Sequence, residues 1–118
     1  MTHPMSCPFC LPPKSSTGSP GDGPVEVAAN DLAFAFRDRF PVSPGHTLVV
    51  TRRHVPDFFG CTPQERAALF ELVDRVKADL DRELRPDAYN VGFNSGEAAG
   101  QTVMHVHVHV IPRFRGDV

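Results

Sequence analysis

Residues 100–113 of this sequence read GQTVMHVHVHVIPR, and this stretch decides the fold prediction. Alternate side chains of a strand point to opposite faces, so a strand over residues 103–111 would place His105, His107 and His109 together on one face. The valines between them would face the core. Imidazole rings add little to the packing of a sheet. Three of them on one face therefore favour a functional surface over the alternative, a merely solvated histidine face.

The sequence around this strand predicts the rest of the fold. Four further stretches with strand-like composition lie at residues 25–27, 32–36, 46–51 and 89–94. Residues 64–84 carry apolar side chains at helical spacing, and Thr62, Pro63 and Glu65 supply the cap, the first helical position and a capping box. The expected fold class is α+β: an antiparallel meander sheet of about five strands with one long helix packed on it.

Composition limits the classes of function. The 118 residues, of which 41% are hydrophobic, predict a single domain over residues 1–118, with a flexible Pro/Gly/Ser-rich loop at 12–24. A net charge of −2 with dispersed Lys and Arg provides no broad cationic surface for a long nucleic acid. No apolar run reaches the roughly 20 residues of a membrane span, and no secretion signal is recognisable. We expect a cytoplasmic protein that binds neither long nucleic acid nor a membrane.

The residues also indicate reaction at phosphorus. A neutral imidazole, with a reference pKa of about 6.5, is a competent nucleophile when one nitrogen is free and the other is held as an N–H. His107 is the best placed of the three because it has a histidine on either side. The preceding turn at residues 100–102 offers backbone N–H groups and a hydroxyl to phosphate oxygens.

Together these stretches resemble the histidine-triad family. The strand is similar to the family signature His-φ-His-φ-His-φ-φ, where φ is apolar, and Gly-Gln-Thr precedes it at residues 100–102. Residues 44–50, PGHTLVV, resemble the Gly-His strand of the family, and residues 94–101, NSGEAAGQ, resemble the loop ahead of the triad. The resemblance covers roughly residues 25–113.

This resemblance implies an enzyme, a nucleotide hydrolase or transferase. It would cleave at the α-phosphorus of nucleoside 5′-phosphoryl compounds, such as phosphoramidates or dinucleoside polyphosphates, and release a nucleoside monophosphate. The resemblance implies that His107 forms a covalent nucleotidyl intermediate and that His109 contacts the phosphate and assists the leaving group. His105 completes the catalytic triad, and His46 would orient its triad neighbour. A purine, AMP-type substrate and a homodimer are also implied.

Four further residues are implied to bind substrate. Asn94, Gln101 and Thr102 match family positions near the phosphate and the leaving atom, and Asp38 matches the position that contacts the ribose hydroxyls. A turn between two arginines is the alternative role for Asp38. The apolar residues Leu32, Phe34 and Phe36 are either part of a base pocket or part of the core.

A second constellation predicts a metal. The Cys-Pro-Phe-Cys sequence at residues 7–10 supplies half of a tetrahedral zinc site. The set Cys7, Cys10, His54 and His105 resembles the arrangement in some bacterial members of the family. This resemblance implies that the four residues hold one structural zinc ion per chain, with no organic cofactor. The alternatives are a loose N-terminus with two incidental thiols, or His3 as a competing ligand. Cys61 is expected to be a small buried residue.

Two other classes of function remain open at this point. A zinc hydrolase could use the histidines as catalytic ligands, but such sites usually add nearby carboxylates. Residues 102–114 contain no Asp or Glu. A non-catalytic mononucleotide-binding regulatory protein would use nearly the same residues as the enzyme.

Overall fold

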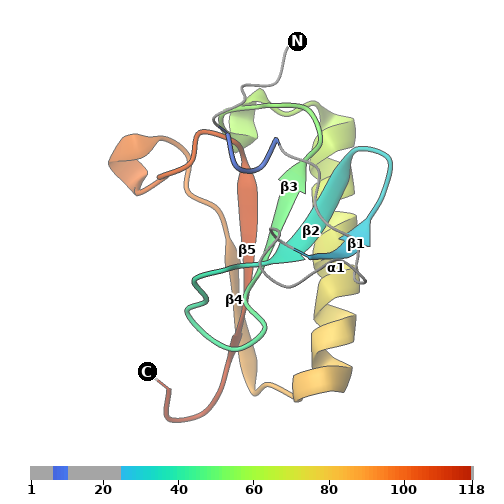
Figure 1. The fold of residues 1–118 in the computed structure, drawn as a ribbon, viewed down its shortest axis with the longest axis vertical. Helices are drawn as coiled ribbons and strands as arrows, with labels where there is room; N and C mark the ends of the chain where they lie inside the picture. Colours follow the sequence, from blue (N-terminus) through green and yellow to red (C-terminus); the bar gives the residue numbers. More distant parts are fainter. Residues whose placement is uncertain (1–6, 11–24, 118) are drawn as a thin grey trace.

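The computed structural model describes residues 7–10 and 25–117 and forms an open antiparallel sheet with a helix along one face (Figure 1). Its strands are β1 (Glu26–Ala29), β2 (Ala33–Arg37), β3 (Thr47–Thr51), β4 (Ala88–Gly92) and β5 (His107–Arg113). Helix α1 (Pro63–Leu84) lies between β3 and β4 in the chain, and the short 3-10 helices are η1 (Phe58–Gly60) and η2 (Glu97–Ala99). The predicted α+β class is confirmed. The predicted loop at 12–24 and His3 lie outside the described residues.

The order of the strands gives β5 an interior position. The sheet runs β1-β2-β3-β5-β4, so the chain leaves β3, crosses through α1 to the edge strand β4 and returns with β5 between β3 and β4. The sequential order expected of a meander therefore changes at the last two strands. The burial of the side chains explains the exchange, because Val108 and Val110 of β5 are fully buried whereas most of β4 is exposed.

The predicted start of the histidine strand was wrong. The prediction began it at residue 103, but β5 begins at His107 and continues to Arg113. The backbone N–H of Val106 is donated to the carbonyl of Val55 at 2.7 Å, outside any strand ladder. His105 therefore lies in a bend before β5, and only His107 and His109 of the triad stand on the strand.

Helix α1 begins where local chemistry predicts. The Thr62 hydroxyl accepts from the Glu65 N–H at 3.0 Å, and the Glu65 carboxylate accepts from the Thr62 N–H at 2.9 Å, which completes the capping box. Arg53 adds two hydrogen bonds to the same carboxylate, at 2.8 and 3.0 Å. The cap is thereby joined to the segment that follows β3, which also carries His54.

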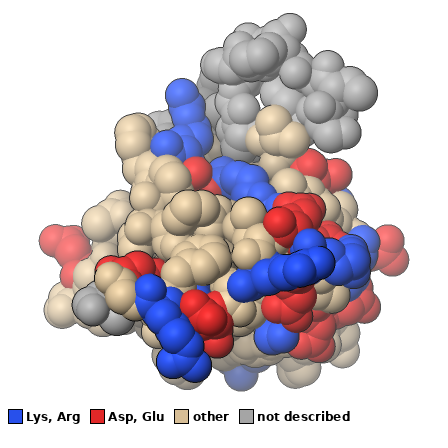
Figure 2. Space-filling view, turned by 90° about the horizontal axis from the view of Figure 1, so that it is seen from below, with Lys and Arg blue, Asp and Glu red and all other residues tan. Residues whose placement is uncertain are grey.

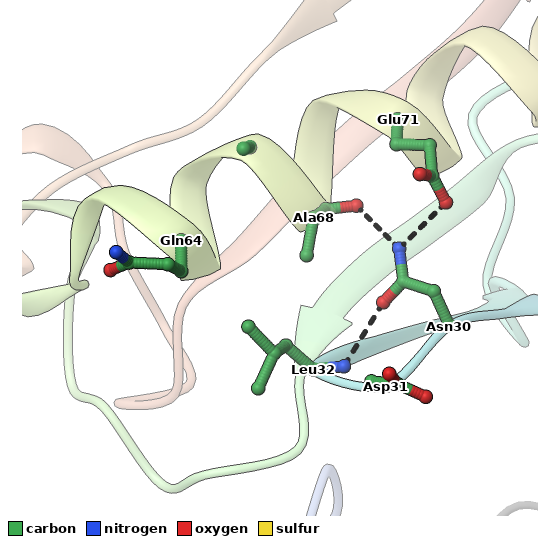
Figure 3. A pocket seen from close by; sticks show the side chains of 7 residues that line it. Asn30, Asp31, Leu32, Gln64, Ala68 and Glu71 are labelled. Atoms are coloured by element: carbon green, nitrogen blue, oxygen red, sulfur yellow. Dashed lines mark hydrogen bonds between the residues drawn. The ribbon is translucent and has the colours of Figure 1, made fainter.

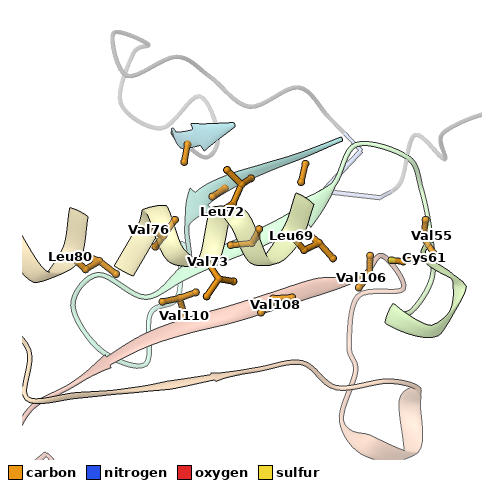
Figure 4. Packing of buried hydrophobic residues seen from close by; sticks show 14 residues of the cluster. Val55, Cys61, Leu69, Leu72, Val73, Val76, Leu80, Val106, Val108 and Val110 are labelled. Carbon is orange, nitrogen blue, oxygen red and sulfur yellow. The ribbon is translucent and has the colours of Figure 1, made fainter. Parts of the chain in front are cut away.

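The two faces of the sheet have different contents. One face packs against the apolar stripe of α1, where burial of each Leu or Val side chain contributes about 1.5–3 kcal/mol. Figure 4 shows this core, which includes Leu69, Leu72, Val73, Val76, Leu80, Val106, Val108 and Val110. Cys61 is buried in the same core, as predicted. The opposite face carries a smaller cluster of Phe34, Phe36, Leu48 and Val50. The two phenylalanines are buried in this cluster, which favours their core interpretation, whereas Leu32 is exposed.

Charge on the surface is mixed. On the face that Figure 2 shows, basic and acidic side chains are interleaved and no broad area carries one sign. Within the described part of the chain, no helix is both long enough and apolar enough to cross a bilayer.

Candidate active site and metal centre

The catalytic candidates lie on the sheet face opposite α1. Strand register pairs His107 with Val50 and His109 with Leu48, and those residues pair in turn with Phe34 and Phe36 of β2. The rings of His107 and His109 are 5.1 Å apart and nearly perpendicular. Strand alternation thus places both imidazoles beside one apolar cluster.

One hydrogen bond fixes the tautomer of His107. Its Nδ1 lies 2.9 Å from the backbone oxygen of His105. A carbonyl oxygen can only accept, so Nδ1 of the neutral ring carries the proton and Nε2 keeps its lone pair. The side chain is largely buried, at 8% exposure. The ring is therefore held with a nucleophilic nitrogen at its far end.

A second chain of hydrogen bonds fixes His46 and His109. The backbone N–H of Val42 is donated to His46 Nδ1 at 3.1 Å, so the neutral His46 carries its proton on Nε2. That Nε2 lies 2.9 Å from His109 Nδ1 and donates to it. His109 in turn carries its proton on Nε2, which makes Nε2 a donor.

Burial favours the neutral form of both rings, His46 and His109. Burial, together with the neighbouring His107 and His46, lowers the pKa of His109 to about 4. Burial also lowers the pKa of His46, and the carboxylate of Asp38 partly opposes this shift. A neutral His109 can donate only one N–H, and the chain from Val42 determines which nitrogen carries it.

Asp38 is attached to this network. One carboxylate oxygen accepts from the Phe40 N–H at 3.0 Å, and the other lies 3.6 Å from His46 Nε2. Asp38, His46 and His109 place possible metal-ligand atoms within 4.8 Å of one another. The proton on His46 Nε2 occupies the lone pair that a metal would require, so this cluster is better suited to hydrogen bonding than to metal binding.

The four predicted metal ligands come together at the start of β5. Ligand atoms of Cys7, Cys10, His54 and His105 lie within 4.8 Å of one another. His105 Nδ1 is 3.5 Å from each sulfur, and His54 Nδ1 is 3.1 Å from Cys10 Sγ. Zinc–sulfur and zinc–nitrogen bonds of about 2.3 and 2.0 Å give sulfur–nitrogen edges of about 3.5 Å in a tetrahedron. The donor set and its spacing fit zinc.

The surroundings of this cluster also suit a cation. His105 is fully buried, and its Nε2 donates to the backbone oxygen of Thr51 at 2.7 Å, so Nδ1 faces the sulfurs with its lone pair. Burial, together with the hydrogen bond to Cys7 and the charge of Cys7, raises the pKa of the Cys10 thiol to about 11. A bound divalent cation would stabilise the thiolate form that this environment disfavours.

The residues implied to bind phosphate, which lie in the loop before β5, differ in their exposure to solvent. Asn94 and Thr102 are exposed, whereas Gln101 is buried. The Gln101 amide donates to the backbone oxygens of Pro56 and Val103 and accepts from the Gly96 N–H, so it braces the loop. Gly100, at φ 96°, lies against Asn94, because a Cβ built there would be 3.4 Å from Asn94 Nδ2.

Sequence reasoning missed three parts of this site. Phe9 lies edge-on to His107, the backbone oxygen of Thr51 orients His105, and the backbone N–H of Val42 sets the tautomer of His46. The two backbone groups leave no mark in the sequence. The sequence did give a reason to consider Phe9, because it lies between the two predicted metal-binding cysteines.

An open hollow of about 440 Å³ lies elsewhere, between α1 and the turn that joins β1 to β2 (Figure 3). Asn30 in its wall donates to the Ala68 carbonyl and to Glu71, at 3.0 and 3.1 Å. Its side-chain oxygen accepts from the Leu32 N–H. The polar atoms of Asn30 thus bind protein groups. Leu32, a candidate for the base pocket, lines this hollow, whereas the predicted catalytic, phosphate-binding and metal-binding residues do not.

Several known proteins are similar to this chain in sequence or in fold. A Schizosaccharomyces pombe protein named bis(5′-nucleosyl)-tetraphosphatase (asymmetrical) is 43% identical over 86 residues, which cover 73% of this chain and 47% of that protein. AP-4-A phosphorylase from Mycobacterium tuberculosis is 37% identical over 92 residues, covering 77% of this chain and 47% of that protein. A solved structure of a Zn-bound histidine triad family protein from Mycobacterium smegmatis matches with a TM-score of 0.79 at 30% identity, covering 96% of this chain and 78% of that one.

The match to the family is broad. Five relatives with sequence similarity are covered by this chain over 47% to 74% of their own length. The family model for the HIT domain matches residues 25–116, which include β1 to β5, the His46–His109 pair and His107. The chain therefore belongs to the HIT domain family.

Proposed function

We propose that this protein is a nucleotide hydrolase or transferase that cleaves at the α-phosphorus of a nucleoside 5′-phosphoryl compound, with His107 as the nucleophile. The observation that carries the proposal is the 2.9 Å hydrogen bond from His107 Nδ1 to the His105 carbonyl. In the neutral ring this bond leaves the lone pair of Nε2 available, as attack on phosphorus requires. The relatives named as a dinucleoside tetraphosphatase and an AP-4-A phosphorylase support the substrate class.

The proposed reaction has two steps. His107 Nε2 attacks the α-phosphorus, and the bond from phosphorus to the leaving atom breaks with its electron pair on that atom. His109 Nε2–H donates a hydrogen bond to the leaving atom as negative charge develops there. Water then attacks phosphorus and loses a proton to the solvent, the phosphorus–nitrogen bond breaks with its electron pair on His107 Nε2, and a nucleoside monophosphate is released. His46 acts on the reaction by holding the tautomer of His109.

The substrate contacts follow from the same assignment. Asp38 is proposed to accept hydrogen bonds from the ribose hydroxyls, since its carboxylate lies near the His46–His109 pair. Asn94 and Thr102 are exposed beside the loop and are proposed to donate to phosphate oxygens. For Gln101, we propose that its buried amide shapes the loop so that backbone N–H groups receive the phosphate. The substrate is proposed to be a purine nucleotide of the AMP type.

Activity with adenosine 5′-phosphoramidates and with diadenosine tetraphosphate tests the nucleophile. The His107→Ala variant should lose several orders of magnitude in kcat for the better substrate while it still binds AMP, because no other ring offers an unprotonated Nε2 at this position. Trapping of a nucleotidyl adduct on His107 by mass spectrometry would support the proposal. Activity of the variant within about tenfold of wild type would exclude covalent catalysis at His107. AMP binding by a wild-type protein without turnover would favour the regulatory alternative.

We also propose that Cys7, Cys10, His54 and His105 bind one zinc ion. The fit of the four donor atoms to a tetrahedron supports this, as does the Zn-bound relative from Mycobacterium smegmatis. Four protein ligands leave no position for water or substrate, so the ion would stabilise structure. Elemental analysis should find one zinc per chain, and the Cys7→Ser/Cys10→Ser variant should lose it. Metal-free wild-type protein, purified with reductant and added zinc, would refute the site.

The setting of the protein is proposed on similar grounds. Two zinc-binding thiolates require reduced cysteines, which suits the cytoplasm. We propose a homodimer because β4 is an edge strand of the sheet that the described residues form and because its Val91 is exposed. Light scattering coupled to size-exclusion chromatography would measure the mass in solution. A monomer at tens of micromolar would refute the dimer.

A further inference from the structure

We propose that residues 7–10, here called the knuckle, position the nucleophile, and that Phe9 transmits metal binding to the ring of His107. The inference rests on the proposed function, because it takes His107 as the nucleophile and the Cys/His cluster as the zinc site. Phe9 is a positioning residue in this proposal. It acts on the orientation of His107 and not on the phosphorus.

The contact between Phe9 and His107 is the first observation. The Phe9 ring lies 5.1 Å from the His107 ring at 74°, an edge-on arrangement that is favourable between aromatic rings. The same ring lies 5.5 Å from Phe36 and 6.0 Å from His105. Phe9 therefore fills the space beside His107, and rotation of the imidazole about its Cβ–Cγ bond would require Phe9 to move.

The second observation is that Phe9 stands between two ligands. The Cys10 N–H is donated to the Cys7 carbonyl at 3.2 Å, which closes a turn with Phe9 inside it. Cys7 Sγ faces His105, and Cys10 Sγ faces His54. With a metal bound, both ends of the turn are fixed to the protein by strong bonds. Thiols are weak hydrogen-bonding groups, so without the metal the same contacts hold the turn much less firmly.

The two supports of the His107 ring differ in their dependence on metal. His107 Nδ1–H is donated to the His105 carbonyl, and His105 is itself held through Nε2 by the Thr51 carbonyl. This support is made of hydrogen bonds within the domain and persists without zinc. Phe9 packs on the apolar cluster through Phe36, and zinc bound by the two flanking cysteines would add the strong bonds that fix its backbone. Metal removal should therefore loosen the ring of His107 without removing its hydrogen-bond acceptor.

Side-chain ¹⁵N NMR of His107 measures this loosening directly, as the fraction of the ring in the Nδ1–H tautomer. In the zinc-loaded wild-type protein we expect this tautomer to dominate. In Phe9→Ala, with one zinc still bound per chain, we expect the fraction to fall. We also expect kcat to fall about two- to tenfold, the range for loss of one aromatic pair, with a smaller change in KM. Phe9→Tyr should restore both values, and Phe59→Ala, which removes an exposed ring, should change neither.

Zinc removal from both proteins completes the test. Chelation should lower the tautomer fraction in the wild type and have little further effect in Phe9→Ala, because the two changes act through one contact. An unchanged tautomer and kcat in zinc-loaded Phe9→Ala would overturn this inference alone. Equal chelation effects in the two proteins would also overturn it. Metal-free wild-type protein would overturn the zinc proposal together with this one, and elemental analysis distinguishes that case.

Discussion

His105 and His109 belong to one repeating sequence, yet the fold gives their rings opposite connections. In His105, Nε2 is bound to the Thr51 carbonyl, and Nδ1 faces two sulfurs. In His109, Nδ1 accepts from His46, and Nε2 carries the proton. One ring therefore offers a lone pair to a cation, and the other offers a proton to an anion.

This difference lies in the neighbours of each ring and not in the residue type. A carbonyl can only accept, so it forces a proton onto the nitrogen that it faces, and a donor has the opposite effect. His107, between them, is held by a carbonyl as His105 is, but it contributes no ligand atom to the Cys/His cluster. The alternating triad thus contains three chemical roles that its repeat does not reveal.

Replacement of His109 should remove the hydrogen bond that is proposed to stabilise the leaving atom. His109→Ala eliminates the donor proposed for the leaving atom, and loss of one such donor lowers kcat by about 10²–10³. Zinc content should remain at one per chain, since His109 is outside the Cys/His cluster. Steady-state kinetics with an amine leaving group, together with elemental analysis, measure both.

The identity of the leaving group sharpens this prediction. A substrate with a strongly acidic leaving group needs little assistance, so His109→Ala should affect it much less than it affects the amine. His109→Gln, which keeps an N–H donor, should be intermediate. An equal loss for both leaving groups would show that His109 does not act on the leaving atom.

Replacement of His105 should remove one of the four proposed zinc ligands. His105→Ala should abolish zinc binding and lower the free energy of unfolding by at least about 2 kcal/mol, because the Thr51 carbonyl loses its donor and a fully buried ring leaves a cavity. His54→Ala is the matched control, since it removes a half-buried ligand. Chemical denaturation in excess chelator should still find His105→Ala the less stable of the two. Equal stability would mean that His105 contributes only through the metal.

Acid should have a smaller effect, on the stability that the buried neutral His109 contributes. The pKa of His109 is about 4 in the folded protein, below the reference of about 6.5 expected when unfolded. Between these values the unfolded chain binds more protons. This group therefore makes the free energy of unfolding fall as pH drops from about 6.5 to about 4, and it adds no further loss below that. His109→Gln should show a shallower decrease of Tm over this window, measured by calorimetry. A parallel decrease in both proteins would contradict the burial of a neutral His109.

Local signals in the sequence predicted much of the fold. The capping box at Thr62 and Glu65 and the apolar stripe of α1 are formed by residues close together in the chain, so both ends of the helix were predicted within one residue. Alternation placed the valines and the two strand histidines on the correct faces. The four metal candidates came from a resemblance and were brought together as expected.

Long-range contacts set the features that the sequence did not reveal. The start of β5 depends on the Val55 carbonyl, which takes the Val106 N–H out of the ladder, and on Gln101, which braces the loop from a buried position. The order of β5 and β4 in the sheet depends on which of the two strands is buried enough to lie between two others. No local pattern around residue 103 encodes these partners.

The interior position of β5 also determines when the site can form during synthesis. His107 pairs with Val50, and His105 faces Cys7, which lies 98 positions earlier in the chain. Contacts between such distant residues carry a large loop-closure cost and form late in folding. On the ribosome, β1 to β3 and α1 emerge before β5, so the position beside β3 stays unoccupied until β5 leaves the exit tunnel. The histidine face therefore forms only after β5 has been synthesised, and a translation product that ends before His105 has neither the proposed nucleophile nor the fourth side chain of the Cys/His cluster.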